Sequence, residues 1–219
     1  MTRSDVRPVL HLAANTSGVR PQAEGAAPPA RPALLAAGLA LLAALWGLPL
    51  ERWMADFPAF MLRHMGLVAL AAPLLVLGLP RLAGLLAINP LLAAVLEFLA
   101  VWGWHTPRLH GLARLEPWAL LLEQGTFLLV GLFVWSGCLR AAQPLAGAGG
   151  LLLTSMHMTL LGALLTLAPR DLYFAFCGTL PDLSGQQLGG MMMLAIGTPV
   201  YLVAGLWLTA RALQGGSTP

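Results

Sequence analysis

The stretch FMLRHMGLVALAAPLLVLGLP, residues 60–80, decides the fold class of this chain. Its ionisable side chains, Arg63 and His64, lie near one end, and apolar residues continue from there to Pro80. A helix needs about 20 mostly apolar residues to cross a bilayer, and a proline commonly marks the end of a helix because it disfavours helical backbone in the residue before it. The stretch therefore predicts a transmembrane helix.

Composition extends this conclusion to the whole chain. Of its 219 residues, 58% are apolar and 10% are charged, whereas a soluble protein has about 25% charged residues. So few charges cannot cover the surface of a soluble domain, which excludes an ordinary cytosolic enzyme and a disordered protein. The apolar runs are long and continuous, unlike the alternating strands of about ten residues in a membrane β-barrel. We therefore expect an all-α, polytopic membrane protein.

Six apolar stretches have the length of a membrane span. They lie at 33–50, 57–79, 85–104, 118–139, 149–168 and 188–213. We therefore expect a six-helix transmembrane domain over residues 33–213, a short C-terminal tail at 214–219 and an N-terminal tail at 1–32. The N-terminal tail has five prolines and no continuous apolar core, which predicts a disordered cytoplasmic segment and not a signal peptide. A short amphipathic surface helix at 9–14 is the alternative for part of it.

The arginines predict the orientation, because basic residues favour the cytoplasmic side. With the N-terminus inside, seven arginines lie on the inner side and five on the outer side: Arg3, Arg7, Arg20, Arg31, Arg81, Arg140 and Arg211 against Arg52, Arg63, Arg108, Arg114 and Arg170. We expect both termini in the cytoplasm and the longer loops, 105–117 and 169–187, at the outer face. This topology separates Cys138 from Cys177 and argues against a disulfide.

The few ionisable residues inside the predicted spans lie toward the outer side. At a helical rise of about 1.5 Å per residue, His64, Glu97 and Glu123 are about 7–10 Å from the outer ends of their helices, and His157 is about 16 Å from its own. Ionisable residues in spans face the interior of a bundle or a water-filled cavity. We therefore predict a polar pocket that opens outward. His105 is expected at the surface, with His110 and Arg114 solvated in the loop and Arg63 reaching the headgroups.

Histidine and methionine residues share helix faces. Met61, His64 and Met65 have the i, i+3, i+4 spacing of one face, and His157 and Met158 are neighbours in a later span. Thioether and imidazole groups suit a soft cation such as Cu(I), but methionine is also a common apolar filler. Glu97 and His105 share a face two turns apart, which fits a proton relay or a ligand-orienting pair. A structural pairing of Glu97 with Arg63 or another span is the alternative.

Four motifs resemble the integral-membrane CtaG-type cytochrome c oxidase assembly factors of bacteria, over about residues 56–211. They are the stretch at 60–80, WGWHTPRLH at 102–110, SMHMTLLGALLTLAPRDLY at 155–173 and LSGQQLGGMMM at 183–193. The resemblance implies a protein that helps respiratory haem–copper oxidases mature at the copper-loading stage. The motifs also depart from the family pattern: Phe60 replaces a histidine, Gln124 replaces a histidine after Glu123, Gly185 replaces an aspartate and Leu194 replaces a tryptophan.

The resemblance also implies site residues. Three histidines match family positions and are candidates for binding copper: His64, His105 and His157. Met61, Met65 and Met158 are candidates to complete the ligand set. The remaining residues of the motifs and the predicted pocket are Glu97, Glu123, Gln186, Gln187, Gly189 and Gly190.

These features predict a non-enzymatic assembly factor at the outer face of the bacterial inner membrane. It would deliver copper to a nascent oxidase subunit or stabilise it, so the expected partners are that subunit, other assembly factors and the lipid bilayer. The alternatives are a copper or small-solute transporter and a haem-binding redox subunit. The chain has no P-loop, no C-x-x-C-H site and no recognisable nucleophile–base pair, and its scattered arginines do not form a nucleic-acid-binding patch.

Overall fold

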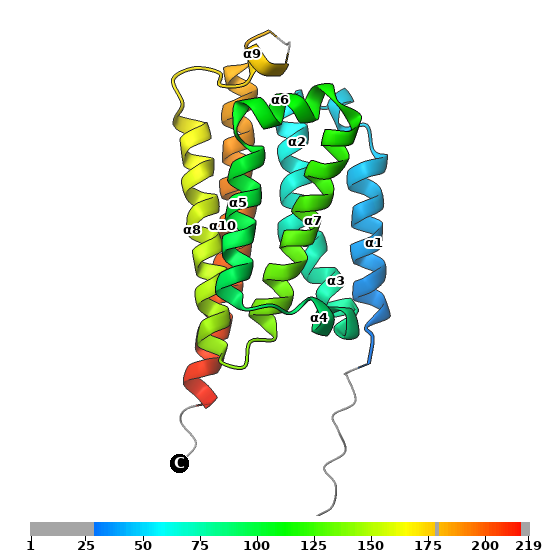
Figure 1. Ribbon diagram of the computed structural model, residues 1–219, viewed down its shortest axis with the longest axis vertical. Coiled ribbons are helices and arrows are strands. Elements are labelled where there is room, and N and C mark those ends of the chain that lie inside the picture. The colour runs from blue at the N-terminus through cyan, green and yellow to red at the C-terminus, as the bar shows by residue number, and fades with distance from the viewer. Residues whose placement is uncertain (1–28, 178–179, 216–219) are drawn as a thin grey trace, which may run out of the picture.

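The computed structural model describes residues 29–177 and 180–215, and every element in these ranges is helical. The long helices lie side by side in one bundle, with short helices across its two ends (Figure 1). This confirms the all-α architecture. The predicted N-terminal tail up to residue 28, including the alternative helix at 9–14, and residues 216–219 lie outside the described residues.

Four helical segments in the described ranges are long and apolar enough to cross a membrane. They are Asp56–Gly78, α7 (Pro117–Leu139), α8 (Pro144–Leu167) and α10 (Leu183–Gly215). A bent pair of helices can supply a fifth span, whereas the apolar α1 (Pro32–Gly47) has 16 residues. These segments confirm a polytopic membrane protein, while the count of six spans and the cytoplasmic termini stay predictions. Helix α1 begins and α10 ends at the same end of the bundle (Figure 1).

The predicted span at 85–104 is interrupted near its start. The structure has α4 (Pro80–Leu86) and α5 (Pro90–Trp104), bent by 83° to each other. The reason is a helix start at Asn89, whose side-chain oxygen accepts hydrogen bonds from the backbone N–H groups of Leu91 (2.9 Å) and Leu92 (3.3 Å). Proline at the next position suits the first turn of a helix and ends the one before it.

The predicted second span is a single rod with a widened segment in the middle. Helix α2 (Asp56–Met65) continues through a π-helical segment, η2 (Gly66–Ala71), into α3 (Ala72–Gly78). The Val68 carbonyl in η2 accepts hydrogen bonds from the Trp135 indole N–H (2.8 Å) and the Tyr201 hydroxyl (3.0 Å). Widened turns of this kind are frequent at functional sites. Here the Val68 carbonyl of η2 connects the second span to α7 and α10.

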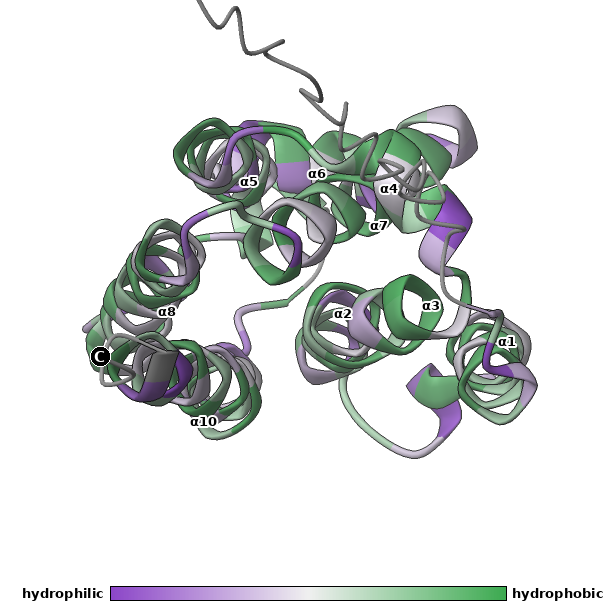
Figure 2. Ribbon diagram, turned by 90° about the horizontal axis from the view of Figure 1, so that it is seen from below, coloured by the Kyte–Doolittle hydropathy of each residue, from purple (hydrophilic) through white to green (hydrophobic). Residues whose placement is uncertain are grey.

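Short helices close the two ends of the bundle. The predicted loop at 105–117 contains α6 (Pro107–Leu115), and the loop at 169–187 contains α9 (Phe174–Cys177). Both lie at the end that we call the α6 end, and α4 lies at the other, the α4 end (Figure 1). Viewed from the α4 end, α10 lies beside α8, and α3 lies between α2 and α1 (Figure 2). The predicted polar pocket belongs to the α6 end.

Close contacts at glycine hold α8 against α10. A Cβ atom at Gly190 would lie 2.5 Å from the Thr166 hydroxyl oxygen and 2.8 Å from the Gly162 carbonyl oxygen. Small residues let helix backbones approach closely in a membrane, where helix association depends on packing. Gly190 of the LSGQQLGGMMM motif therefore lets α10 lie close beside α8.

Candidate functional site

Two of the predicted histidines meet inside the bundle. His64 of α2 and His105, directly after α5, have ring centroids 5.1 Å apart, and we call them the histidine pair. Their exposed fractions are 0% and 5%. The expectation that His105 lies at the surface is wrong, because α6 folds back over the end of α5 and the Tyr173 hydroxyl donates to the His105 carbonyl oxygen (2.9 Å).

The histidine pair has three ring nitrogens without a hydrogen-bond partner among the described residues: His64 Nδ1, His64 Nε2 and His105 Nε2. The fourth, His105 Nδ1, lies 2.7 Å from the Val101 carbonyl oxygen. A carbonyl only accepts, so Nδ1 carries the proton and Nε2 keeps its lone pair. Buried polar atoms are rarely left unpaired. Three such nitrogens in one place are what a site for a ligand with two imidazole donors requires.

Aromatic rings surround the histidine pair. The Phe127 ring of α7 lies 4.1 Å from the His64 ring, and the Phe60 ring of α2 lies 5.4 Å from the His105 ring, in both cases between centroids. Phe60 also lies 4.6 Å from the ring of His110. Phe60, which stands at a family histidine position, therefore lies among three imidazoles and separates His110 from the pair.

A charged layer lies beside these rings. Arg114 of α6 forms an ion pair with Glu123 of α7, and Gln124 donates to the same carboxylate (3.1 Å). The Arg114 guanidinium also lies over the Phe60 ring, 4.9 Å from its centroid. His110 is 2% exposed. The expectation that His110 and Arg114 are solvated is therefore wrong, because α6 packs the face that carries His110, Ala113 and Arg114 inward.

Arg63 does not extend freely toward headgroups. Its guanidinium forms an ion pair with Glu51 and donates to the carbonyl oxygens of Leu45 (2.9 Å) and Leu48 (3.3 Å) at the end of α1. This hydrogen bond with Arg63 lowers the pKa of the Glu51 carboxyl. Arg63 thus joins α2 to the last turn of α1 instead of pairing with Glu97.

The remaining predicted ligands lie in the contacts between α2, α8 and α10. Met61 packs beside Gly189, where a Cβ atom would lie 3.6 Å from the methionine Cβ. Met65 and Met158 meet at Gly197: a Cβ atom there would lie 3.1 Å from the Met65 sulfur and 3.8 Å from the Met158 Cβ. The three methionines therefore line the packing surface of α10.

His157 lies apart from the ring contacts of the histidine pair. Its ring is 5.5 Å from that of Phe98 on α5, and both ring nitrogens lack a partner among the described residues. In the described ranges, no group of three or more His, Cys, Asp or Glu side chains is placed to hold a metal ion. The structure thus joins two of the three predicted histidines, and metal binding by the set stays a prediction.

Glu97 belongs to a second buried cluster, the glutamate node, which also contains Tyr201, Trp135 and the Val68 carbonyl. The Tyr201 hydroxyl lies 2.8 Å from Glu97 Oε1 and 3.0 Å from the Val68 oxygen. The Tyr201 hydroxyl has one proton and cannot donate to both oxygens at once. If it donates to the Val68 carbonyl, its contact with Glu97 is a hydrogen bond only when the Glu97 carboxyl carries a proton and donates to the Tyr201 oxygen. Glu97 pairs with another span and not with His105 or Arg63, as the structural alternative predicts.

The glutamine motif fastens the loop at the α6 end to α10. The Gln186 side chain donates to the Leu165 carbonyl oxygen (3.1 Å) and accepts from the Leu172 N–H (2.8 Å), while Gln187 is partly exposed. Asp182 accepts from the Gly185 N–H (2.9 Å), and a Cβ atom at Gly185 would lie 2.1 Å from an Asp182 oxygen. Glycine at 185 therefore fits because the Asp182 carboxylate occupies the space beside it.

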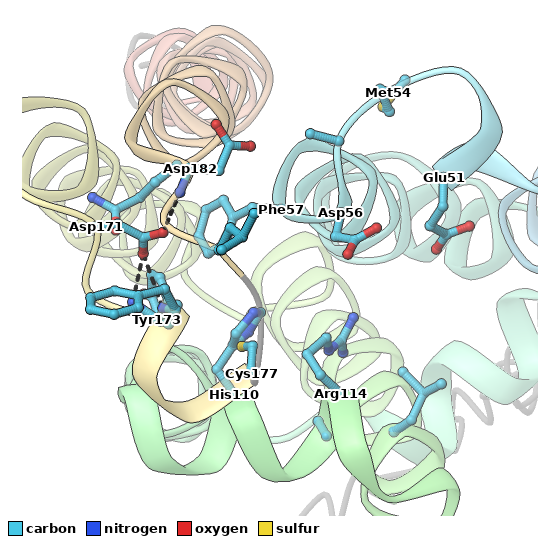
Figure 3. Close-up of a pocket in the computed structure, with 16 residues that line it drawn as sticks. Glu51, Met54, Asp56, Phe57, His110, Arg114, Asp171, Tyr173, Cys177 and Asp182 are labelled. Carbon is cyan, nitrogen blue, oxygen red and sulfur yellow. Dashed lines mark hydrogen bonds between the residues drawn. The ribbon is translucent and has the colours of Figure 1, made fainter.

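A pocket of about 590 Å³ opens at the α6 end, and we call it the mouth (Figure 3). Its lining includes charged residues and a thiol: Glu51, Asp56, Arg114, Asp171, Asp182 and Cys177. Glu51 is paired with Arg63 and Arg114 with Glu123, so the three aspartates give the mouth a negative charge.

His110, Phe57 and Tyr173 form the part of the mouth nearest the histidine pair. All three line the pocket, and the Phe57 ring lies 5.4 Å from that of His110 and 4.8 Å from that of Tyr173. Burial, with a smaller effect of the Arg114 charge, lowers the pKa of His110 well below its usual range. His110 is therefore neutral at physiological pH, and its Nδ1 has no partner among the described residues.

Sequence reasoning missed four of these participants: His110, Arg114, Tyr173 and Tyr201. The sequence does contain a sign of the first two, because His110 and Arg114 have the i, i+4 spacing of one face, with Ala113 between them, on a short helix that begins at Pro107. Tyr173 ends the motif at 155–173, but Tyr201 and Tyr173 reach their partners only through contacts between segments far apart in the chain.

A family model described as cytochrome c oxidase caa3 assembly factor (Caa3_CtaG) matches residues 12–214. The match spans nearly the whole chain and includes the four motifs that carry the histidine pair, the mouth and the contact between α8 and α10. Comparison with curated proteins gave no match, and comparison with solved structures gave none either. The chain therefore belongs to the family of cytochrome c oxidase caa3 assembly factors.

Proposed function

We propose that this assembly factor binds copper at the histidine pair and delivers it to a nascent oxidase subunit, without catalysing a reaction. In this proposal the α6 end faces the outer side of the bacterial inner membrane. Copper is cargo, held for transfer. The family match supports the role in oxidase assembly, and the copper step rests on the chemistry of His64 and His105.

The observation that carries the proposal is the set of three unpartnered nitrogens on two adjoining, buried imidazoles. A protein that used these rings only for packing would leave three buried polar atoms unsatisfied at a cost of about 1–3 kcal/mol each. A bound cation takes one lone pair from each of the two imidazoles and removes that cost for two of the three atoms. Imidazole is a good copper ligand, whereas Met61 and Met65 of the same rod pack against α10 and are not needed for this proposal.

The mouth supplies an approach for the cation. Asp56, Asp171 and Asp182 attract positive charge, and His110 with its free Nδ1 stands between them and the histidine pair. Phe60 and Phe57 then shield the pair from water. A shielded site suits Cu(I), and an opening at one end of the bundle suits transfer to a subunit docked there.

Copper binding under reducing conditions tests the proposal. Cu(I) is titrated into purified protein against a colorimetric chelator, with wild type, His64→Ala, His105→Ala and His157→Ala in parallel. Wild type is expected to bind one copper ion, and the first two variants are expected to lose it. His157→Ala serves as the control for a buried histidine outside the pair and is expected to keep it. Wild-type protein that binds no Cu(I) would overturn the copper step.

Two further measurements separate the alternative functions and the partner. A Soret band in the visible spectrum would identify a haem protein, and copper uptake into proteoliposomes would identify a transporter; we expect neither. Co-purification with a tagged oxidase subunit is expected for an assembly factor, and it is expected to survive in His64→Ala if docking and copper transfer use different residues. A chain that retains no oxidase subunit would contradict direct action on the enzyme.

A further inference from the structure

The α4 end carries positive charge without a carboxylate near it. Four exposed arginines belong to this end: Arg31, Arg81, Arg140 and Arg211. The carboxylic residues of the described ranges belong to the α6 end or lie inside the bundle: Glu51, Asp56, Glu97, Glu116, Glu123, Asp171 and Asp182. Neither ion pair found among the described residues involves any of the four arginines.

Packing contacts bring these arginines onto one part of the structure. The Arg31 N–H donates to the Gly78 carbonyl oxygen (2.9 Å), which places Arg31 beside the start of α4. The Arg140 guanidinium lies against α4, 3.5 Å from the position of a Cβ atom at Gly84. A Cβ atom at Gly147 would lie 2.1 Å from the Cys138 oxygen and 3.2 Å from Leu208, so the ends of α7 and α10 adjoin there.

An apolar groove leads from these arginines toward the middle of the bundle. It has a volume of about 640 Å³ and runs between α3, α7 and α10. Its lining includes Leu77, Trp135, Leu139, Pro199, Val203 and Trp207. The Trp135 N–H, a polar group in this lining, is already bonded to the Val68 carbonyl. The groove thus offers dispersion contacts and no charged or hydroxyl group to a ligand.

Trp207 connects the groove to the positive charge. The Arg211 guanidinium lies over the Trp207 ring, 4.9 Å from its centroid. The two residues are one helical turn apart, about 6 Å along α10. On α7, Arg140 directly follows Leu139 of the groove lining. An apolar slot therefore ends at Arg211, whereas the Arg140 guanidinium lies against α4.

We propose that the α4 end binds an anionic phospholipid, with an acyl chain in the groove and the phosphate at Arg211. The ligand must combine a long apolar chain with a negative head, because the groove has nothing to bond a polar group and the arginines have no carboxylate. Basic residues at the mouths of apolar grooves between membrane helices favour anionic lipid headgroups. A partner helix could fill the groove, but it would leave the arginines without a counter-charge.

Native mass spectrometry of the detergent-purified full chain tests this site. The probe is an equimolar mixture of phosphatidylglycerol and phosphatidylcholine with identical acyl chains. Wild type is expected to retain phosphatidylglycerol at least about fivefold better than phosphatidylcholine. This ratio corresponds to the attraction between about one arginine and an anionic membrane surface. Arg211→Gln is expected to remove this preference, whereas Arg170→Gln, an exposed arginine near the α6 end, is expected to keep it.

Two further arms separate the acyl chain from the headgroup. Ala204→Phe, which fills the groove, is expected to reduce retention of both lipids, and the copper titration described above shows whether this variant is folded. If the variant fails to fold, short-chain phosphatidylglycerol replaces it as the test and should bind more weakly than the long-chain lipid. Glycerol phosphate, which carries the headgroup charge without chains, is expected not to displace the bound lipid. Equal retention of the two lipids by wild type, an equal effect of Arg170→Gln, or displacement by glycerol phosphate would each overturn the proposal.

Discussion

The histidine pair and the glutamate node are both buried polar clusters inside the bundle, yet their hydrogen bonding differs. In the glutamate node, the Trp135 N–H, the Tyr201 hydroxyl and one oxygen of Glu97 are bonded, and Glu97 Oε2 is left without a partner among the described residues. In the histidine pair, three of four ring nitrogens have no partner among the described residues. A bonded cluster stabilises the fold by itself, whereas an unbonded one is complete only with a ligand. The difference fits a structural role for the first cluster and the binding role that we propose for the second.

The largest effect is expected from His64→Phe, which tests whether the histidine pair binds a ligand and does not stabilise the fold. The ring keeps the shape of the site and removes two unpartnered nitrogens, so the free energy of unfolding should stay the same or rise. Copper affinity should fall by at least about 100-fold, because even changes behind a metal ligand weaken binding 10–100-fold. Thermal unfolding and the Cu(I) titration measure the two quantities. A clear loss of stability would mean that His64 has a structural partner.

The opposite pattern is expected for Glu97→Ala. Removing the carboxyl leaves the Tyr201 hydroxyl with one partner fewer and should lower the free energy of unfolding by about 1–3 kcal/mol, while copper binding stays. Glu97→Gln is the matched control: its amide N–H₂ can donate to Tyr201 as a protonated carboxyl does, so most of the stability should return. Denaturation in detergent measures both variants, and an equal loss in Glu97→Gln would contradict the proton on Glu97.

A smaller effect is expected from Phe60→His, which would extend the histidine pair. Phe60 lies within 5.4 Å of the His105 ring and 4.6 Å of the His110 ring between centroids, so a histidine there adds a nitrogen donor. We expect about tenfold tighter Cu(I) binding, equivalent to about 1.4 kcal/mol. Phe60→Leu, without a donor, should bind copper as wild type does, and equal affinity in all three proteins would place the copper elsewhere.

The smallest effect concerns Glu51→Gln at the edge of the mouth. The Arg63 hydrogen bond lowers the pKa of Glu51, so the ion pair stabilises the fold above the usual pKa of glutamate and is lost as the pH falls through the lowered value. The Glu51 side chain is 45% exposed, so solvent screening limits the change to a few tenths of a kcal/mol. Stability measured between pH 4 and pH 7 should vary less in Glu51→Gln than in wild type; a variant that unfolds like Glu97→Ala would contradict this.

Much of the fold follows from local properties of the sequence. Apolar runs of about 20 residues identify the long helices, and prolines mark their starts within a few residues, as at Pro117 and Pro144. The break between α4 and α5 was missed because hydropathy counts apolar residues without regard to direction. The Asn89 side chain, which starts a new helix at an angle of 83°, decides the direction there.

The candidate site could be predicted in part. His64, His105 and Glu97 were found because an ionisable group in an apolar span is rare and needs a reason. Their partners were not found, because partners come from segments separated by up to 133 residues, as for Tyr201 and Val68. The burial of His110 and Arg114 was also missed, since only the packing of α6 across the bundle removes them from water.

The sequence by itself determined a helical membrane protein of a recognisable family, because hydropathy and motif order are properties of neighbouring residues. The tertiary structure alone decided which polar groups meet. It joined His64 to His105, gave Glu97 to Tyr201, and placed Arg211 at the end of an apolar groove. Hydrogen bonds and ring contacts act over a few ångströms, so helix packing must bring these groups together before their roles can differ.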